Sequence, residues 1–416
     1  MSLPSAPTGS AHPTRQVLAI PAVRRFAIAQ LCSTLGFSLL RATVAWHIWK
    51  VTGSYALLGT LGFVEFLPVI PVALLGGAIA DSTARSKIVT RTLATSGVLT
   101  IPLCLSAGLH RAEQGTVLTT AFLLAISSSL QRPASAALLP TLVPTALFPA
   151  ATVLSANVRN SAFVGGPMLM GFLTRMFGIA TAYATCGSLL LIGALVMSTL
   201  PYDMPATQRR AIRWSTIADG IHFVRRQPVL LSSMALDMFA VIFAGATALL
   251  PVFADEVLGV GELGYGLLSA SMQIGTLIAA AMLLIQPTMR HPGRWLLWSV
   301  VVFGASTVVF GLSRSYPLSL LAFVVAGMAD QVSMTARSII AQLNTPDELR
   351  GRVSAVSMIF IGASNELGAA ESGYLAALTS ATFSTVFGGL VCLGVAAITT
   401  TIVPSLRRYE VRPKTV

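Results

Sequence analysis

Nine ionisable side chains lie inside apolar stretches of this sequence, each of which is about long enough to span a bilayer. They are Arg41, Glu65, Arg132, Arg159, Asp237, Asp330, Arg337, Glu366 and Glu371. A charge in hydrocarbon costs a few kcal/mol on insertion scales, so such a residue usually faces a partner of opposite charge or a water-filled cavity. Their chemistry would be the transfer of protons by carboxylates and the binding of anionic groups by arginines.

Three carboxylates are the candidates for carrying a proton. Proton coupling requires a carboxylate whose proton affinity changes when its surroundings change. Glu65 lies about 10 residues, or roughly 15 Å of helix, inside its apolar stretch, and Asp237 is similarly deep. Asp330 is the third candidate. The alternative for each of them is a permanent structural ion pair.

The remaining charges are expected to line a cavity or an interface between helices. Arg41 is the expected partner of Glu65, because their stretches are adjacent in the sequence. Arg159 is expected to pair with a carboxylate of the C-terminal half or to bind an anionic group of a cargo. Asp330 and Arg337 are seven residues apart and share one helix face, about 10 Å apart along the axis. The other members of this set are Arg132, Glu366 and Glu371.

The elements that must position these residues are membrane helices. Hydrophobic residues make up 54% of the chain and charged residues 10%, and the mean hydropathy is +0.78. At ~20 residues per span, the apolar runs leave room for about twelve helices. The runs are continuous rather than alternating, which favours helices over a barrel. The expected spans are 22–48, 55–80, 88–109, 115–139, 146–174, 178–200, 229–254, 263–286, 295–313, 316–342, 348–378 and 382–403.

The positive charge of the chain indicates its orientation in the membrane. The net charge is +12, yet most of the 27 Lys and Arg residues gather in the termini and in alternate connections. By the positive-inside rule, both termini and the central connection are expected to be cytoplasmic, in a bacterial inner membrane. This distribution argues against a nucleic-acid partner. Cys32, Cys104, Cys186 and Cys392 lie within spans at no metal-like spacing, so we expect no metal site and no cofactor.

The chain divides into two related halves. The expected organisation is a cytoplasmic tail (1–21), a six-helix bundle (22–200), a cytoplasmic linker with an amphipathic helix (201–228), a second six-helix bundle (229–404) and a second tail (405–416). The halves match at an offset of 202 residues. The matching pairs are Pro144 and Pro346, Leu147 and Leu349, Ser155 and Ser357, Gly166 and Gly368, and Gly171 and Gly373. A duplication of six spans is therefore favoured.

A short motif between the second and third expected spans resembles the signature of the major facilitator superfamily. The residues that match it are Gly77, Asp81, Arg85 and Lys87, whereas Ser82 and Ala84 depart from it. Gly77 would permit close approach of a neighbouring helix. Asp81 can accept hydrogen bonds from the start of a helix. Arg85 can reach an acidic partner and latch the cytoplasmic ends of the two halves.

The resemblance extends to the branch that includes the enterobactin exporter and macrolide efflux proteins. The segments that carry it are 52–54, 139–144, 165–167, 219–226, 250–253, 264–268 and 348–353. It implies a major facilitator fold of two pseudo-symmetric six-helix bundles. It also implies export of a small amphipathic compound, such as a drug, macrolide or siderophore, by alternating access. The proton gradient would be the energy source.

The positions of the nine charges agree with that resemblance. In the major facilitator fold, spans 1, 4, 7 and 10 line the central cavity, and spans 3, 6, 9 and 12 lie outside. The nine charges fall in spans 1, 2, 4, 5, 7, 10 and 11, and none falls in an outer span. This is the pattern expected of a polar cavity.

Other functions remain as alternatives. One is proton-coupled import of a nutrient or a lysolipid-like substrate, because residue types do not determine the direction of transport. A non-transporting membrane scaffold is another, but it has no need of buried charges in cavity-lining spans. The sequence lacks a nucleotide-binding P-loop and hydrolase motifs, so no enzyme is expected. The expected partners are a small-molecule substrate, protons and the bilayer, and the protein is expected to be a monomer.

Overall fold

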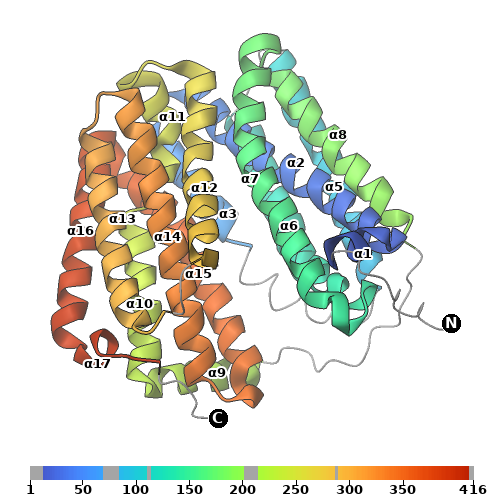
Figure 1. Ribbon diagram of the computed structural model, residues 1–416. Helices are drawn as coiled ribbons and strands as arrows, with labels where there is room; N and C mark the ends of the chain where they lie inside the picture. The colour runs from blue at the N-terminus through green and yellow to red at the C-terminus, as the bar shows by residue number, and fades with distance from the viewer. Residues whose placement is uncertain (1–12, 69–83, 110–113, 201–213, 286–288, 412–416) are drawn as a thin grey trace. The chain divides into compact units, whose positions relative to one another are not determined.

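The computed structural model describes residues 13–68, 84–109, 114–200, 214–285 and 289–411, and within them the chain is helical without strands (Figure 1). The helices before residue 201 are α1 (Pro13–Ala19), α2 (Pro21–Thr52), α3 (Tyr55–Phe66), α5 (Arg85–Gly108), α6 (Gln114–Leu142), η1 (Thr145–Leu147), α7 (Phe148–Phe177) and α8 (Ile179–Ser198). Those after residue 213 are α9 (Trp214–Arg226), α10 (Pro228–Phe243), η2 (Ala246–Leu249), α11 (Leu250–Val252), η3 (Phe253–Val257), α12 (Gly261–Ile285), α13 (Pro292–Leu312), α14 (Tyr316–Asn344), η4 (Asp347–Leu349), α15 (Arg350–Leu378), α16 (Ala381–Ile402) and α17 (Pro404–Arg407).

Among these residues, nine helices are long and apolar enough to cross a membrane, or ten if α6 and α7 together form one bent span. The axes of α6 and α7 differ by 118°. Each has 29 or 30 residues, roughly 44 Å of helix, which alone exceeds the hydrocarbon thickness. The second expected span, 55–80, begins as α3 and continues into residues outside the described ranges. A total of twelve spans therefore stays a prediction.

Proline and glycine set the helix boundaries. Pro228 and Pro292 occupy the first turns of α10 and α13, where the missing backbone N–H is not needed. Gly53 separates α2 from α3 and Gly178 separates α7 from α8, with φ of 57° and 85°. L-residues with side chains rarely adopt this left-handed region, so both turns favour glycine.

The chain forms two compact units. The first comprises the described parts of 1–44 and 67–211, and the second those of 45–66 and 212–416. The expected bundle boundaries placed all of 22–200 in the N-terminal bundle, so the grouping of 45–66 with the C-terminal half is a difference from that expectation. Its cause is local packing, since the end of α2 and all of α3 contact helices that follow residue 250.

Within the second unit, α3 packs on α15 through glycines. A Cβ atom on Gly373 would overlap the Cα of Gly59. A Cβ on Gly62 would lie 2.6 Å from the Cβ of Ala369. The absence of side chains at these positions lets the two helix backbones touch, as small residues do in other membrane helix pairs.

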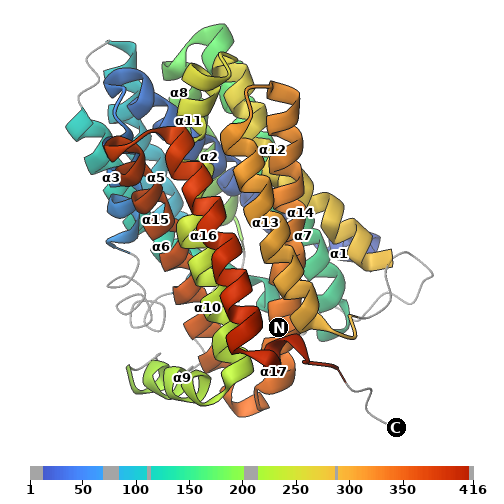
Figure 2. The same ribbon diagram turned by 90° about the vertical axis from the view of Figure 1, so that its left-hand side faces the viewer.

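Helix α9 is the amphipathic helix expected in the linker region 201–228. It lies across the end of the second unit near α10 and α15 (Figure 2). A Cβ on Gly220 would lie 3.0 Å from the carbonyl oxygen of Arg352. Val224 is buried, whereas Arg225 and Arg226 are exposed. The helix therefore has one packed face and one solvated, basic face.

Candidate functional site

Two of the predicted charges form a buried ion pair between α10 and α14. Arg337 Nη1 lies 2.5 Å from Asp237 Oδ2, and the two side chains are 15% and 8% exposed. Asp237 is a buried residue of α10, as are its sequence neighbours Leu236 and Ala240 in the apolar core. Arg337 Nε is buried and has no hydrogen-bond partner in the part of the chain that the structure describes. The guanidinium is therefore only partly satisfied by Asp237.

Asp330 belongs to the same electrostatic cluster. It lies on α14, two turns before Arg337, and the charge of Arg337 acts on both Asp237 and Asp330. Ser333 lies between them on the same face of α14, and its buried hydroxyl lacks a partner among the described residues. The cluster thus contains two carboxylates, one arginine and one unsatisfied hydroxyl.

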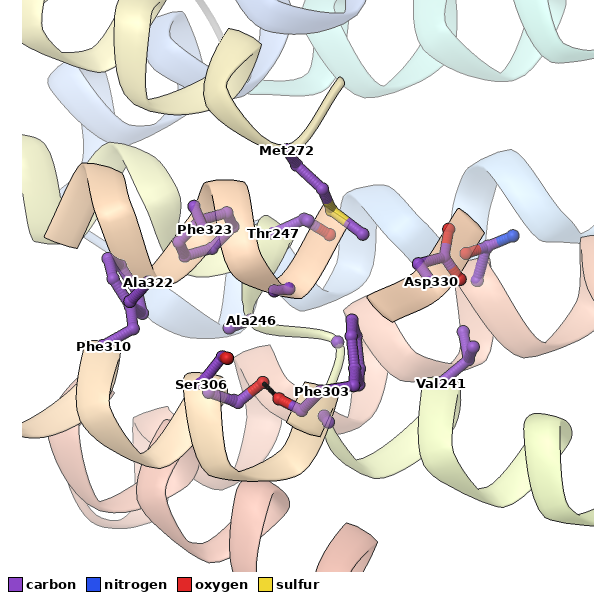
Figure 3. A pocket seen from close by; sticks show the side chains of 15 residues that line it. Val241, Ala246, Thr247, Met272, Phe303, Ser306, Phe310, Ala322, Phe323 and Asp330 are labelled. Atoms are coloured by element: carbon purple, nitrogen blue, oxygen red, sulfur yellow. Dashed lines mark hydrogen bonds between the residues drawn. The ribbon is translucent and has the colours of Figure 1, made fainter. Parts of the chain in front are cut away.

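A cavity of about 80 Å³ adjoins Asp330 inside the second unit (Figure 3). Asp330 and Val241 lie at one end of its lining, and Phe310 and Ala322 lie at the other. Its further polar lining comes from Thr247, Ser306, Thr307 and Asn365. A water needs about 10–15 Å³ by this measure. The cavity can therefore hold several water molecules in contact with the Asp330 carboxylate.

Aromatic rings close the cavity at the end away from Asp330. The ring of Phe310 lies 4.4 Å from the ring of Phe323 and 4.4 Å from that of Phe253, between centroids. Such edge and tilted contacts are the favoured arrangements of aromatic pairs. The cavity therefore has the Asp330 carboxylate at one end and aromatic rings at the other, with hydroxyl groups along its lining.

A second polar cluster joins residues 49–55 to the segment after α11. Lys50 Nζ lies 3.2 Å from Asp255 Oδ2, to which Trp49 Nε1 also donates at 3.0 Å. Tyr55 donates to Glu256 Oε2 at 3.0 Å. Next to these contacts, Trp46 stacks on Tyr265 at 5.1 Å between ring centroids.

The sequence reasoning missed this second cluster. The acidic pair Asp255 and Glu256, directly after a long apolar run, was the available signal, but nothing in the sequence gives its partner.

The other predicted charges lie outside these clusters or in the first unit. In the second unit Glu65 and Glu366 are partly buried, and Glu371 accepts a hydrogen bond of 3.4 Å from the neighbouring Ser372. In the first unit the three arginines are exposed: they are Arg41, Arg132 and Arg159. The predicted pairing of Arg41 with Glu65 involves residues of different units and stays a prediction.

The predicted latch motif is described in part. Gly77 and Asp81 lie outside the described residues. Arg85 begins α5, and its Nη1 donates to the carbonyl oxygen of Ala137 on α6 at 3.1 Å. The contact described for Arg85 is thus to a carbonyl within its own unit. Lys87 is exposed two residues further along α5.

Comparison with known proteins decides the family. The profile described as Major Facilitator Superfamily matches residues 26–369. The chain belongs to this superfamily. It is accordingly a multi-pass membrane transport protein with a small-molecule substrate, and not an enzyme.

Named relatives of this major facilitator protein include enterobactin exporters. The enterobactin exporter EntS of Shigella boydii serotype 4 (strain Sb227) is 25% identical over 398 residues, which is 94% of each chain. The enterobactin exporter EntS of Escherichia coli O1:K1 / APEC is 25% identical over 405 residues, again 94% of each chain.

Solved structures of transporters share the fold. The peptide transporter POT in complex with sulfate has a TM-score of 0.72 at 14% identity, covering 96% of this chain and 100% of that one. The nucleoside transporter NupG has a TM-score of 0.70 at 14% identity, covering 94% and 100%. A bacterial homolog of the human lysosomal transporter Spinster has a TM-score of 0.67 at 15% identity, covering 97% and 100%. At these identities the likeness concerns the fold alone.

Proposed function

We propose that this major facilitator protein exports a small amphipathic compound in exchange for protons. The observation that carries the proposal is the buried Asp237–Arg337 pair, with Asp330 two turns from Arg337 and beside a cavity that can hold several water molecules. A membrane interior holds such groups at a cost, and proton relays in transporters are built from them. The proton gradient is the energy source, and no cofactor takes part.

The proposed coupling step is a change of charge at Asp237. When Asp237 takes up a proton, its attraction to Arg337 is lost, and Arg337 keeps only Asp330 as a carboxylate within the cluster. The free energy of the cluster therefore depends on protonation. Because Arg337 is then balanced by one carboxylate instead of two, we propose that a different packing of α10 against α14 becomes favoured. Water in the cavity beside Asp330 would deliver or remove the proton.

Support for the direction and for the cargo comes from the relatives. Two relatives that match over 94% of the chain are named enterobactin exporters. Enterobactin-like siderophores, macrolides and drugs are amphipathic, and we propose compounds of this kind as the cargo. We further propose that the protein is a monomer in a bacterial inner membrane. The distribution of Lys and Arg favours cytoplasmic termini.

Transport by reconstituted protein tests the proposal. Full-length protein in proteoliposomes would be given an imposed pH gradient and a panel of siderophores, macrolides, dyes and lysolipids. We expect flux of one compound class against its own gradient, driven by protons moving the opposite way. Collapse of the pH gradient should abolish this uphill flux. Flux in the same direction as the protons would instead indicate import, and flux insensitive to the gradient would exclude proton coupling.

Two substitutions locate the proton site within that assay. Asp237→Asn keeps the shape of the side chain and removes the ionisable group, and Glu65→Gln does the same at the other leading candidate. If Asp237 is the coupling site, Asp237→Asn loses uphill flux but still exchanges labelled cargo across the membrane. If both variants retain gradient-driven flux, both assignments are wrong.

A further inference from the structure

An apolar groove runs along the outside of the second unit over α14. Helices α12 and α13 each pack along α14, which lies between them (Figure 1). The groove between α12 and α13 measures about 350 Å³. Ala329 and Val332 of α14 form its floor, Met282 of α12 forms one wall, and Trp298 and Val302 of α13 form the other.

Glycines hold α12 closely against α14 beside this groove. A Cβ on Gly275 would overlap the backbone of Val324, and one on Gly327 would overlap that of Met272, so α12 and α14 touch there. Beyond Gly275, α12 runs on towards its end, where Leu284 and Ile285 are 89% and 86% exposed. The helices therefore leave a trough towards the ends that meet the α12–α13 connection.

The groove presents hydrocarbon and almost no polar surface. Trp298 is 67% exposed and Met282 is 51% exposed. The polar side chain in the lining is Ser299, and its hydroxyl is used within α13, donating to the carbonyl of Leu296 at 2.8 Å. In a protein that spans a membrane, an apolar trough of this kind faces acyl chains. Trp298 and Val302 are about one helical turn apart, so this wall of the groove extends along α13 for roughly one turn.

Arginines stand at the end of the groove where the helices meet the connection. Arg294 precedes Trp298 by four residues and therefore lies on the same side of α13, one turn closer to the helix start. Arg290 is exposed in the connection just before α13, and its carbonyl accepts from Val411 N at 2.9 Å. That contact brings the C-terminal segment to the same end. The exposed charges of that segment are Arg407, Arg408 and Glu410.

We propose that this groove binds one anionic phospholipid. Its acyl chain would lie against Met282, Trp298 and Val302, and its phosphate would lie at Arg290 and Arg294. Tryptophan rings at the depth of the headgroups suit this arrangement. Basic pockets between membrane helices select anionic headgroups, because a zwitterionic lipid carries its own cation beside the phosphate. The proposal is independent of the cargo and of proton coupling.

Quenching of tryptophan fluorescence by brominated lipids tests the site. Full-length protein would be reconstituted into phosphatidylcholine vesicles with increasing fractions of dibrominated phosphatidylglycerol or dibrominated phosphatidylcholine. The chain has five tryptophans, so the difference between wild type and Trp298→Phe isolates the signal of Trp298. We expect half-maximal quenching of Trp298 at a lower fraction of phosphatidylglycerol, by roughly fivefold for each arginine that contributes.

Charge variants separate a headgroup site from general contact with lipid. Arg290→Gln with Arg294→Gln should remove the preference for phosphatidylglycerol and leave quenching by both lipids equal. Arg314→Gln is the matched control, because Arg314 is exposed just past the opposite end of α13, and it should keep the preference. Equal quenching by both lipids in the wild type would overturn the proposal. So would a preference that survives the double substitution.

Discussion

At the scale of single residues, Arg337 between two carboxylates determines how the charge cluster responds to substitution. Removing one partner of a buried pair typically costs about 3–5 kcal/mol, because the other charge stays buried. Here Arg337 forms an ion pair with Asp237 and also interacts electrostatically with Asp330. Loss of either carboxylate therefore leaves Arg337 a second one.

We therefore predict that substitutions of the two carboxylates are not additive. Asp237→Asn and Asp330→Asn should each lower the stability by less than the loss of a whole buried ion pair would. The double variant should be less stable than the sum of the two, by about 0.5–3 kcal/mol, since Arg337 then lacks both carboxylates. Denaturation of the purified protein in detergent measures this coupling.

The matched control for that cycle removes the arginine as well. Adding Arg337→Gln to the double variant should recover stability, because no isolated charge is left in the bundle. Strictly additive losses would show that Asp330 and Asp237 do not share Arg337. A triple variant less stable than the double variant would show that the packing of the Arg337 stem, rather than its charge, dominates.

The sequence could identify these residues among nine charges in apolar runs, but it could not predict that these three gather or how they pair. Asp237, Asp330 and Arg337 stand out because charges are rare in apolar runs. Spacing along α14 places Asp330 and Arg337 on one face, since only helix geometry is needed for that. The pairing of Asp237 with Arg337 joins residues one hundred positions apart. It depends on the tilt and depth of α10 against α14, which local patterns do not encode.

At the scale of helices, glycines decide where two backbones can touch. Gly373 of α15 and Gly59 of α3 face each other so closely that a Cβ on Gly373 would overlap Gly59. The internal repeat pairs Gly373 with Gly171, and both glycines are predicted to lie inside helices. It cannot predict that α3 is the partner, because the helix that approaches a glycine depends on the tertiary packing.

Gly373→Ala is predicted to disrupt the packing of α3 on α15. The added methyl group must push the two backbones apart, as overpacking does in other tightly packed interiors, at a cost of about 1–3 kcal/mol. We expect a lower melting temperature and a loss of transport in proteoliposomes.

Gly362→Ala on the same helix is the control for this prediction. No atom among the described residues lies within 4 Å of a Cβ placed on Gly362. Alanine also favours helix over glycine by up to about 1 kcal/mol, so Gly362→Ala should be neutral or stabilising. Equal losses in both variants would mean that helix α15, and not its contact with α3, is sensitive to substitution.

At the scale of the whole molecule, the charge distribution predicts the orientation in the membrane. Most Lys and Arg residues lie in the termini and in alternate connections, which predicts that both termini are cytoplasmic. A green fluorescent protein fused after Val416 should therefore fluoresce, and alkaline phosphatase fused at the same point should be inactive. The reverse result would mean that the side of the membrane predicted for each terminus and each connection is wrong. A phosphatase fusion after Gly53, in the connection between α2 and α3, is the matched control and should be active.

Transport by alternating access also requires segments of the two sequence halves to part and rejoin. Residues 45–66 come from the N-terminal half of the chain, yet Lys50 pairs with Asp255 and Tyr55 with Glu256 from the C-terminal half. If the halves open at this end during each cycle, these bonds must break every time. They are exposed enough for their net cost to be small: Lys50 is 46% exposed and Asp255 is 28% exposed.

A covalent link at this point should therefore stop transport. Lys50→Cys with Asp255→Cys, in a background without the four native cysteines, would be joined by a short bifunctional thiol reagent that a reductant cleaves. We expect transport to fall to background after linking and to return on reduction. Asp347→Cys with Arg350→Cys is the control, since that pair is 2.9 Å apart at the start of one helix and linking it restricts no separation of the halves. Undiminished transport by the linked Lys50–Asp255 variant would show that the contacts between these two segments persist through the whole cycle.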